Sequence, residues 1–191
     1  PFTYPAGRIR IPNDSKSRAG GVLYSDYSLG RFFAEAARQP WFENTIFLVT
    51  ADHCASSAGR TEIPLQKYHI PALILAPGLI EPGVVDGIVS QIDLMPTLLS
   101  LLNMSYDSHF YGRSIFDPAY VNRAFIATYQ DLGYLEGDTF TILSPVRRFE
   151  QYRVVPTEEN PHHLETMERK DAMQVDRAIG YYQTSCKWNK R

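Results

Sequence analysis

The pair Asp52-His53 ends an apolar stretch of the sequence and is the chain's strongest candidate for metal chemistry. Residues 45–51 read Thr-Ile-Phe-Leu-Val-Thr-Ala, a β-branched and aromatic run that predicts a buried strand. Ionisable side chains at the end of such a strand need compensation for lost hydration, and a metal ion would supply it. Successive side chains of a strand point to opposite faces, so the backbone must bend here before both residues can bind one ion.

The residues after the pair are small, from Cys54 to Gly59, which is typical of a tight loop with room for a ligand. In open α/β sheets, ligands bind at loops that follow the carboxyl ends of strands. A structural alternative is that Asp52 caps a turn and that His53 is a hydrogen-bonded loop residue. Cys54 is expected to be a small buried residue, not a nucleophile or a metal ligand.

The neighbouring sequence predicts the elements that would position this pair. Apolar residues at helical spacing over 22–37, ended by a proline, indicate an amphipathic helix before the strand. A second short strand is expected within 69–77, and a helix over 94–102 with Ser90 or Asp93 as its cap. This alternation of helices and strands is the pattern of a parallel α/β sheet.

The last third of the chain predicts consecutive strands instead of alternating helices and strands. Aromatic and β-branched runs predict strands within 124–129, 134–143 and 148–155, with a break at 136–138. Turn residues between these runs favour an antiparallel meander. Residues 164–182 then carry apolar residues at helical spacing, which predicts a final amphipathic helix.

Composition excludes several classes of function. The chain has 191 residues, 44% hydrophobic, which is ordinary for a globular domain. Nineteen basic and twenty-one acidic residues give a net charge of -2, so no nucleic-acid partner is expected. Cys54 and Cys186 lie far apart and indicate neither a disulfide framework nor a zinc ribbon. No apolar run reaches the roughly 18 residues of a membrane span, and the missing initiator Met suggests a fragment of a larger protein.

Four ordered motifs resemble the carboxyl-terminal half of the sulfatase-like branch of the alkaline phosphatase superfamily. Within this branch the likeness is greatest to lipoteichoic acid synthase-type phosphoglycerol transferases, and it covers residues 1–116 best. Pro1-Phe2 is similar to the end of the family's Ser-x-His-x-Pro-Phe segment. The four motifs are Tyr24-Ser-Asp-Tyr27, Asn44 to His53, Tyr68 to Gly78 and Val89 to Leu99.

The resemblance implies an α/β, alkaline phosphatase-like sandwich with a mainly parallel sheet and helices on both faces. An antiparallel meander and a final helix would follow. The whole chain would then be the carboxyl-terminal half of a sulfatase-like catalytic domain, outside the cytoplasmic membrane and in a membrane-anchored parent. Its expected parts are a leading loop (1–20), an α/β core (21–120), antiparallel strands (121–160) and a terminal helix with its tail (161–191).

The resemblance also makes Asp52 and His53 ligands of a catalytic divalent cation. Such an ion stabilises the charge that develops on a transferred phosphoryl or sulfuryl group. A mixed oxygen and nitrogen ligand set favours Mn or Zn, with Mg or Ca as alternatives. Lys67, His69 and Arg60 are candidates for binding the anionic substrate, although each has a solvated or hydrogen-bonded surface role as its alternative.

In this family the nucleophile and the first metal-binding acid lie upstream of the matched segment. The chain is therefore expected to need the amino-terminal half of its own catalytic domain as a partner, and to be inactive alone. Its substrate would be a phosphate or sulfate ester, a lipid-linked one included. Phosphoglycerol transfer is the first expectation, with sulfate-ester hydrolysis and a non-catalytic binding domain as alternatives. His162 and His163 are expected to be exposed loop residues.

Overall fold

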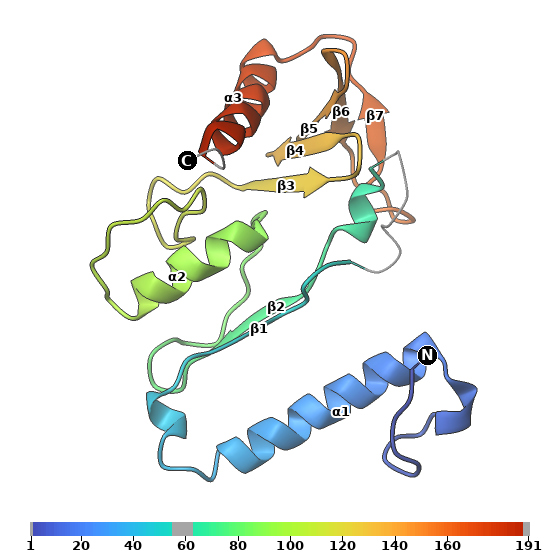
Figure 1. The fold of residues 1–191 in the computed structure, drawn as a ribbon, viewed down its shortest axis with the longest axis vertical. Helices are drawn as coiled ribbons and strands as arrows, with labels where there is room; N and C mark the ends of the chain where they lie inside the picture. The colour runs from blue at the N-terminus through green and yellow to red at the C-terminus, as the bar shows by residue number, and fades with distance from the viewer. Residues whose placement is uncertain (1, 55–62, 189–191) are drawn as a thin grey trace. The chain divides into compact units, whose positions relative to one another are not determined.

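The structure, a computed structural model, describes residues 2–54 and 63–188 (Figure 1). The chain divides into two compact units. The first comprises Pro1–Phe47 with Leu75–Glu81, and the second comprises Leu48–Ile74 with Pro82–Arg191. No helix within the described residues is long and apolar enough to cross a membrane.

The first unit is built on helix α1 (Arg18–Ala36), which confirms the helix predicted before the strand. Ser17 caps α1, because its hydroxyl oxygen accepts the backbone N–H of Gly20 at 3.0 Å. Phe47 packs edge-on against Phe33 with ring centroids 5.3 Å apart, which secures the carboxyl-terminal part of the helix. Two short 3-10 helices flank α1: η1 (Asn13–Ser15) and η2 (Phe42–Asn44).

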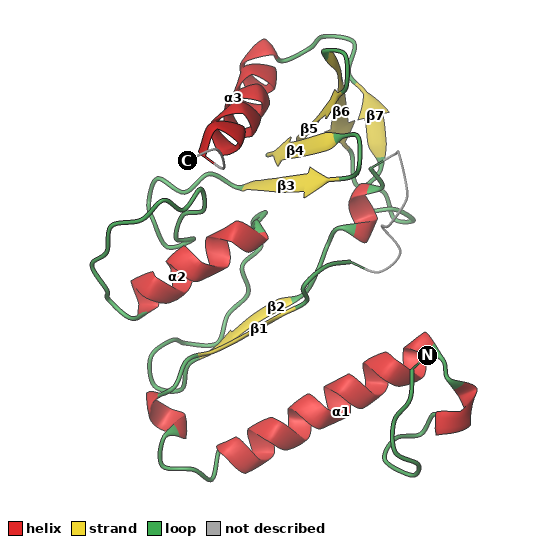
Figure 2. Cartoon of the chain, viewed as in Figure 1, coloured by secondary structure: helices red, strands yellow, loops and turns green. Residues whose placement is uncertain are grey.

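Two of the predicted strands pair in a two-stranded sheet, β1 (Phe47–Thr50) and β2 (Ala72–Leu75) (Figure 2). The backbone bends directly after β1, as the adjacent acid and imidazole required. The N–H of Ala51 donates to the carbonyl of Pro71 at 3.3 Å, so the end of β1 lies beside the start of β2. A 3-10 helix, η3 (Leu65–Lys67), precedes β2.

Helix α2 (Leu94–Leu101) follows the 3-10 helix η4 (Gln91–Asp93), which confirms the helix predicted from residue 94. The Asp93 carboxylate accepts the backbone N–H of Ser90 at 3.1 Å. This bond satisfies a donor that the turn would otherwise leave without a partner. The Asp93 side chain thus closes the turn of η4, whereas at the start of α2 it makes no capping hydrogen bond of its own.

The predicted meander forms a five-stranded sheet in chain order, and all four of its pairings are antiparallel. Short turns join the consecutive strands, and parallel strands would need crossovers of a dozen or more residues. The antiparallel meander predicted for this part of the chain is therefore confirmed. Gly137 adopts a φ of 58° in the turn at the predicted break. The strands are β3 (Arg123–Ala127), β4 (Leu132–Glu136), β5 (Thr139–Ser144), β6 (Arg148–Val154) and β7 (Leu164–Thr166).

The two faces of this sheet have different partners, because side chains alternate along each strand. On one face, Tyr134, Thr141 and Gln151 lie opposite one another in register. Helix α3 (Ala172–Trp188) packs against this face, and its Gln174 accepts a hydrogen bond from Thr141. The other face forms a hydrophobic core with the start of η3 and the residues before it. This core is made of Ile63, Leu65, Ile126, Leu135 and Phe140.

The final helix begins later than the sequence predicted, at Ala172 instead of residue 164. Residues 164–166 pair with β6 as the edge strand β7, so ladder hydrogen bonds override the helical spacing there. Asp171 then caps α3, because its carboxylate accepts the N–H of Gln174 at 3.1 Å. The buried amide of Gln151 also binds both backbone groups of Asp171, which fixes where the helix begins.

Candidate metal centre

Asp52 and His53 lie in the bend after β1, and their side chains converge; we call these two residues the metal pair. Oδ2 of Asp52 lies 3.5 Å from Nε2 of His53. With metal–ligand bonds of about 2.0–2.2 Å, two donors of one tetrahedral ion lie roughly 3.3–3.5 Å apart. The two atoms therefore have the spacing of ligands that share one ion.

Local hydrogen bonds prepare the metal pair for this role. Nδ1 of His53 lies 2.7 Å from the carbonyl oxygen of Cys54. Because a carbonyl oxygen only accepts, Nδ1 is the donor, and in the neutral imidazole Nε2 then has the lone pair that a metal ion binds. Oδ1 of Asp52 accepts the backbone N–H of His53 at 2.9 Å, which orients the carboxylate. The donor set fits a divalent cation, and Cys54 is buried, as expected of a structural residue.

The metal pair is exposed, which corrects one step of the sequence argument. The side chains of Asp52 and His53 are 88% and 75% exposed. The predicted strand is itself only half-buried and ends at Thr50, so the charges that follow it lose little hydration. Within the described residues, no group of three or more His, Cys, Asp or Glu side chains gathers around an ion. The described part of the chain thus offers two candidate ligands, Asp52 and His53.

Gln91 holds the bend in place, a role that the sequence did not reveal. Its side-chain amide donates to the carbonyl of Ala51 at 3.0 Å and to that of Asp52 at 3.2 Å. Gln91 belongs to η4 and is separated from the bend by about forty residues, so no local spacing signals the contact. The backbone that carries the metal pair is therefore fixed from a second element.

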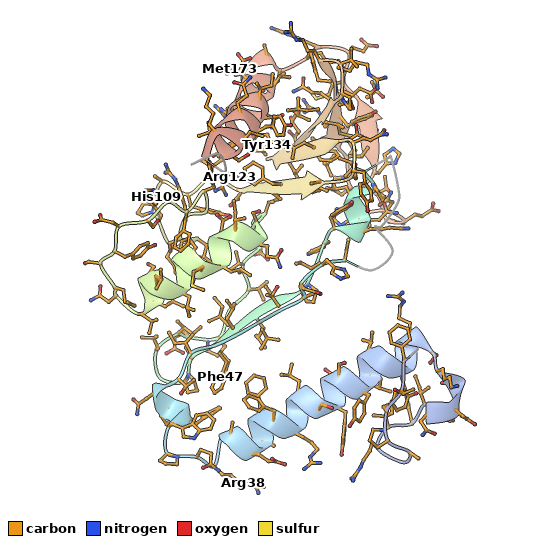
Figure 3. The ribbon with its side chains drawn as sticks, in the orientation of Figure 1. Arg38, Phe47, His109, Arg123, Tyr134 and Met173 are labelled. Carbon is orange, nitrogen blue, oxygen red and sulfur yellow. The ribbon has the colours of Figure 1, made fainter. Side chains whose placement is uncertain are left out.

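Asp93, which belongs to the same 3-10 helix as Gln91, forms a buried ion pair with Arg123. Asp93 is fully buried and Arg123 is 3% exposed, with Nη1 and Oδ2 2.9 Å apart. Figure 3 shows Arg123 at the start of β3. The carboxylate also accepts the N–H of Arg113 at 2.8 Å and the hydroxyl of Tyr120 at 2.9 Å. Burial, and then the bond to Asp93, raises the pKa of Tyr120 well above its usual value, so its hydroxyl remains a donor.

The structure describes two of the three residues that the sequence predicted to bind the substrate anion. Lys67 closes η3 and is half-buried, and His69 is exposed two residues further on. The bond between Ala51 and Pro71 places this segment at the same end of the two-stranded sheet as the metal pair. Arg60 lies outside the described residues.

His162 is half-buried, whereas the sequence predicted an exposed residue. Its ring meets that of His69 edge to face, with centroids 5.6 Å apart and planes at 87°. Burial, together with the nearby charge of His69, lowers the pKa of His162 below its usual 6.5. His163, the next residue, is exposed as predicted.

Comparison with known proteins identifies relatives of this fold. The Sulfatase family model matches residues 5–104, a range that includes the metal pair. An arylsulfatase of Clostridium perfringens is 30% identical over 107 residues, which cover 51% of this chain. The crystal structure of a protein in the alkaline phosphatase superfamily from Vibrio parahaemolyticus matches 96% of the chain, with a TM-score of 0.82 and 30% identity.

These matches confirm the alkaline phosphatase-type fold expected from the sequence. They also show how much of each relative the chain represents. It spans 22% of the length of the arylsulfatase and 46% of the Vibrio structure. The chain therefore corresponds to less than half of either relative.

Proposed function

The chain belongs to the sulfatase family, and from this we propose that it is part of a metal-dependent enzyme that hydrolyses sulfate esters. The observation that carries the proposal is the metal pair inside the matched range, with Oδ2 and Nε2 3.5 Å apart and Nδ1 engaged elsewhere. When bound, the cation would stabilise the negative charge that develops on the transferred group. Asp52 and His53 would hold it, and Gln91 would keep their backbone in place.

Sulfate esters are our first choice of substrate because the curated relative is an arylsulfatase. Phosphate-ester chemistry, including phosphoglycerol transfer to or from a lipid-linked substrate, is the second candidate. It is favoured by the four motifs that resemble phosphoglycerol transferases. In either case Lys67 and His69 are proposed to meet the substrate anion, from the end of the sheet where the metal pair lies.

The remaining parts of the site are proposed to come from the amino-terminal half of the same catalytic domain. Family likeness assigns to it the nucleophile and the first metal-binding acid. A mixed carboxylate and imidazole set favours Mn or Zn over Mg or Ca. We also propose an extracytoplasmic location and a membrane-anchored parent, both by family likeness.

Metal titration tests the first step of this proposal. Calorimetry with Mn²⁺ and Zn²⁺ should show a site in the chain that Asp52→Ala and His53→Ala each weaken at least about 10-fold. Asp86→Ala is the matched control, because Asp86 is also an exposed aspartate and the change removes the same charge. Unchanged affinity in the Asp52 and His53 variants would favour the non-catalytic binding domain instead.

Activity tests the second step, in a polypeptide that also contains the preceding half of the catalytic domain. The Asp52→Ala enzyme should lose nearly all turnover of an aryl sulfate, and the Asp86→Ala enzyme should keep it. Parallel assays with the matching aryl phosphate and with a phosphoglycerol lipid separate the two substrate classes. Turnover of the phosphoglycerol lipid alone would replace hydrolysis of sulfate esters by the transferase proposal.

A further inference from the structure

Two hairpin turns lie at the same end of the five-stranded sheet. The first turn, residues 128–131, joins β3 to β4, and the second, residues 145–147, joins β5 to β6. Because β3 to β6 are neighbours in chain order and pair antiparallel, alternate turns come to one end. The hydroxyl of Ser144 donates to the carboxylate of Asp131 at 2.6 Å, which ties the two turns together.

Hydrogen bonds hold the backbone of both turns in place. The N–H of Thr128 donates to the carbonyl of Asp131 at 2.9 Å, and the Thr128 hydroxyl accepts the N–H of Asp131 at 3.0 Å. In the second turn, Nε of Arg148 donates to the carbonyl of Pro145 at 3.4 Å. Turns that are fixed in this way present their side chains to a partner with little loss of conformational entropy.

These turns carry the two most exposed large hydrophobic side chains of the described residues. Tyr129 is 93% exposed and Val146 is 90% exposed. Val146 also has a φ of 64°, a conformation that is strained for a β-branched residue and easy for Asn or Gly. Stability of the fold therefore does not explain why valine occupies this position. Strain of this kind is found where a side chain is needed for a function.

Two arginines complete the surface. Arg147 and Arg148 are exposed, and neither forms an ion pair with another described residue. Residues 129–130 and 145–148 include no acidic side chain, although the whole chain has a net charge of -2. We call Tyr129, Val146, Arg147 and Arg148 the tip surface. It combines exposed apolar groups with local positive charge.

We infer that the tip surface binds the surface of an anionic phospholipid membrane. Tyrosine rings favour the headgroup level of a bilayer, where the ring is partly desolvated and the hydroxyl stays hydrated. Arginine binds phosphate oxygens in a bidentate manner, and a positive surface is attracted to anionic lipids. A protein partner is a poorer match, because two separate apolar side chains fall far short of the roughly 800 Å² that a stable interface buries on each side. The inference rests on neither the metal pair nor the proposed enzyme activity.

Cosedimentation of the chain with lipid vesicles tests the inference. Vesicles of phosphatidylglycerol and phosphatidylcholine should bind the chain at least about 10-fold better than vesicles of phosphatidylcholine alone, since each arginine contributes about 5-fold near an anionic surface. Arg148→Gln should weaken binding to the mixed vesicles about 5-fold. Arg169→Gln is the matched control, because Arg169 is also exposed and the change removes the same charge. Equal binding to both kinds of vesicle would overturn the inference, as would an equal loss in the two arginine variants.

A second variant separates binding from folding. Val146→Asn/Arg147→Gly places residues that favour positive φ in the turn, so the thermal midpoint should rise. The same change removes one apolar group and one positive charge, so binding to the mixed vesicles should fall at least about 5-fold. Val84→Asn is its control, because Val84 is 85% exposed. A higher thermal midpoint with unchanged vesicle binding would overturn the inference.

The longer polypeptide that also contains the preceding half of the catalytic domain provides the final test. It should bind the mixed vesicles as well as the chain does. Loss of vesicle binding in the longer polypeptide would assign the tip surface to a contact with that half, and would overturn the inference. Turnover of an aryl sulfate in the absence of vesicles should be the same with and without Val146→Asn/Arg147→Gly. Failure of the proposed function and failure of this inference are therefore distinguishable.

Discussion

Replacement of Arg123 by methionine will test whether the buried ion pair holds the second unit together. The Asp93 carboxylate accepts three hydrogen bonds from the guanidinium group, at 2.9, 3.1 and 3.2 Å. Without that group the carboxylate keeps its bonds to Ser90, Arg113 and Tyr120, but no positive charge. Removal of one partner of a buried ion pair costs about 3–5 kcal/mol. We expect a loss of this size in the free energy of unfolding.

Urea unfolding followed by circular dichroism measures this loss, and the chain offers a matched control. Arg153 pairs with Asp138 at 3.1 Å, but both side chains are more than half exposed. Arg153→Met should therefore cost less than about 1 kcal/mol. The double variant Asp93→Asn/Arg123→Met removes both buried charges and should recover part of the stability that the single variant loses.

The double variant separates an unpaired charge from a simple packing defect. Asp93→Asn removes the unpaired charge without restoring the packing of the arginine side chain, so it recovers stability only if the charge causes the deficit. The reasoning would be refuted if Arg123→Met cost no more than Arg153→Met. A double variant no more stable than Arg123→Met alone would point to lost packing instead.

Three further predictions concern turns and loops. Val146 and Arg147 adopt φ values of 64° and 57°, so replacing them by Asn-Gly should stabilise the chain by about 1–2 kcal/mol in thermal unfolding. Gln91→Ala should weaken Mn²⁺ binding by the metal pair about 10-fold in calorimetry, with a stability change within about 1 kcal/mol. Burial and a neighbouring imidazole lower the pKa of His162, so the folded chain resists its protonation and loses stability as pH falls below the usual 6.5. Thermal melts with a chelator should show a smaller acid-induced loss for His162→Gln; an equal loss would contradict this assignment.

Local patterns in the sequence were sufficient for most of the elements. Helix α1, strands β3 to β6 and helix α2 carry their periodicity and turn residues within a few positions. The bend after β1 also followed from local geometry, because two adjacent strand side chains cannot otherwise meet. Strand β7 was missed because its three residues have no period of their own and depend on pairing with β6.

The supports of the site could not be read from local patterns. Gln91 reaches the carbonyls of Ala51 and Asp52 across about forty residues, and Arg123 reaches Asp93 across thirty. Such contacts are fixed by tertiary packing, which leaves no repeat or spacing in the sequence. The exposure of the metal pair was likewise misjudged, because an apolar composition does not reveal that β1 is only half-buried and four residues long.

The burial of Asp93 also sets the order in which the bend at residue 52, η4 and β3 can fold. The bend at residue 52 depends on Gln91, and the turn that carries Gln91 depends on Asp93, whose counter-charge arrives only with β3. During synthesis the loop with the metal pair would leave the ribosome some seventy residues before Arg123. A nascent chain stalled anywhere in that interval would display Asp52 and His53 but lack the buried ion pair that supports their bend.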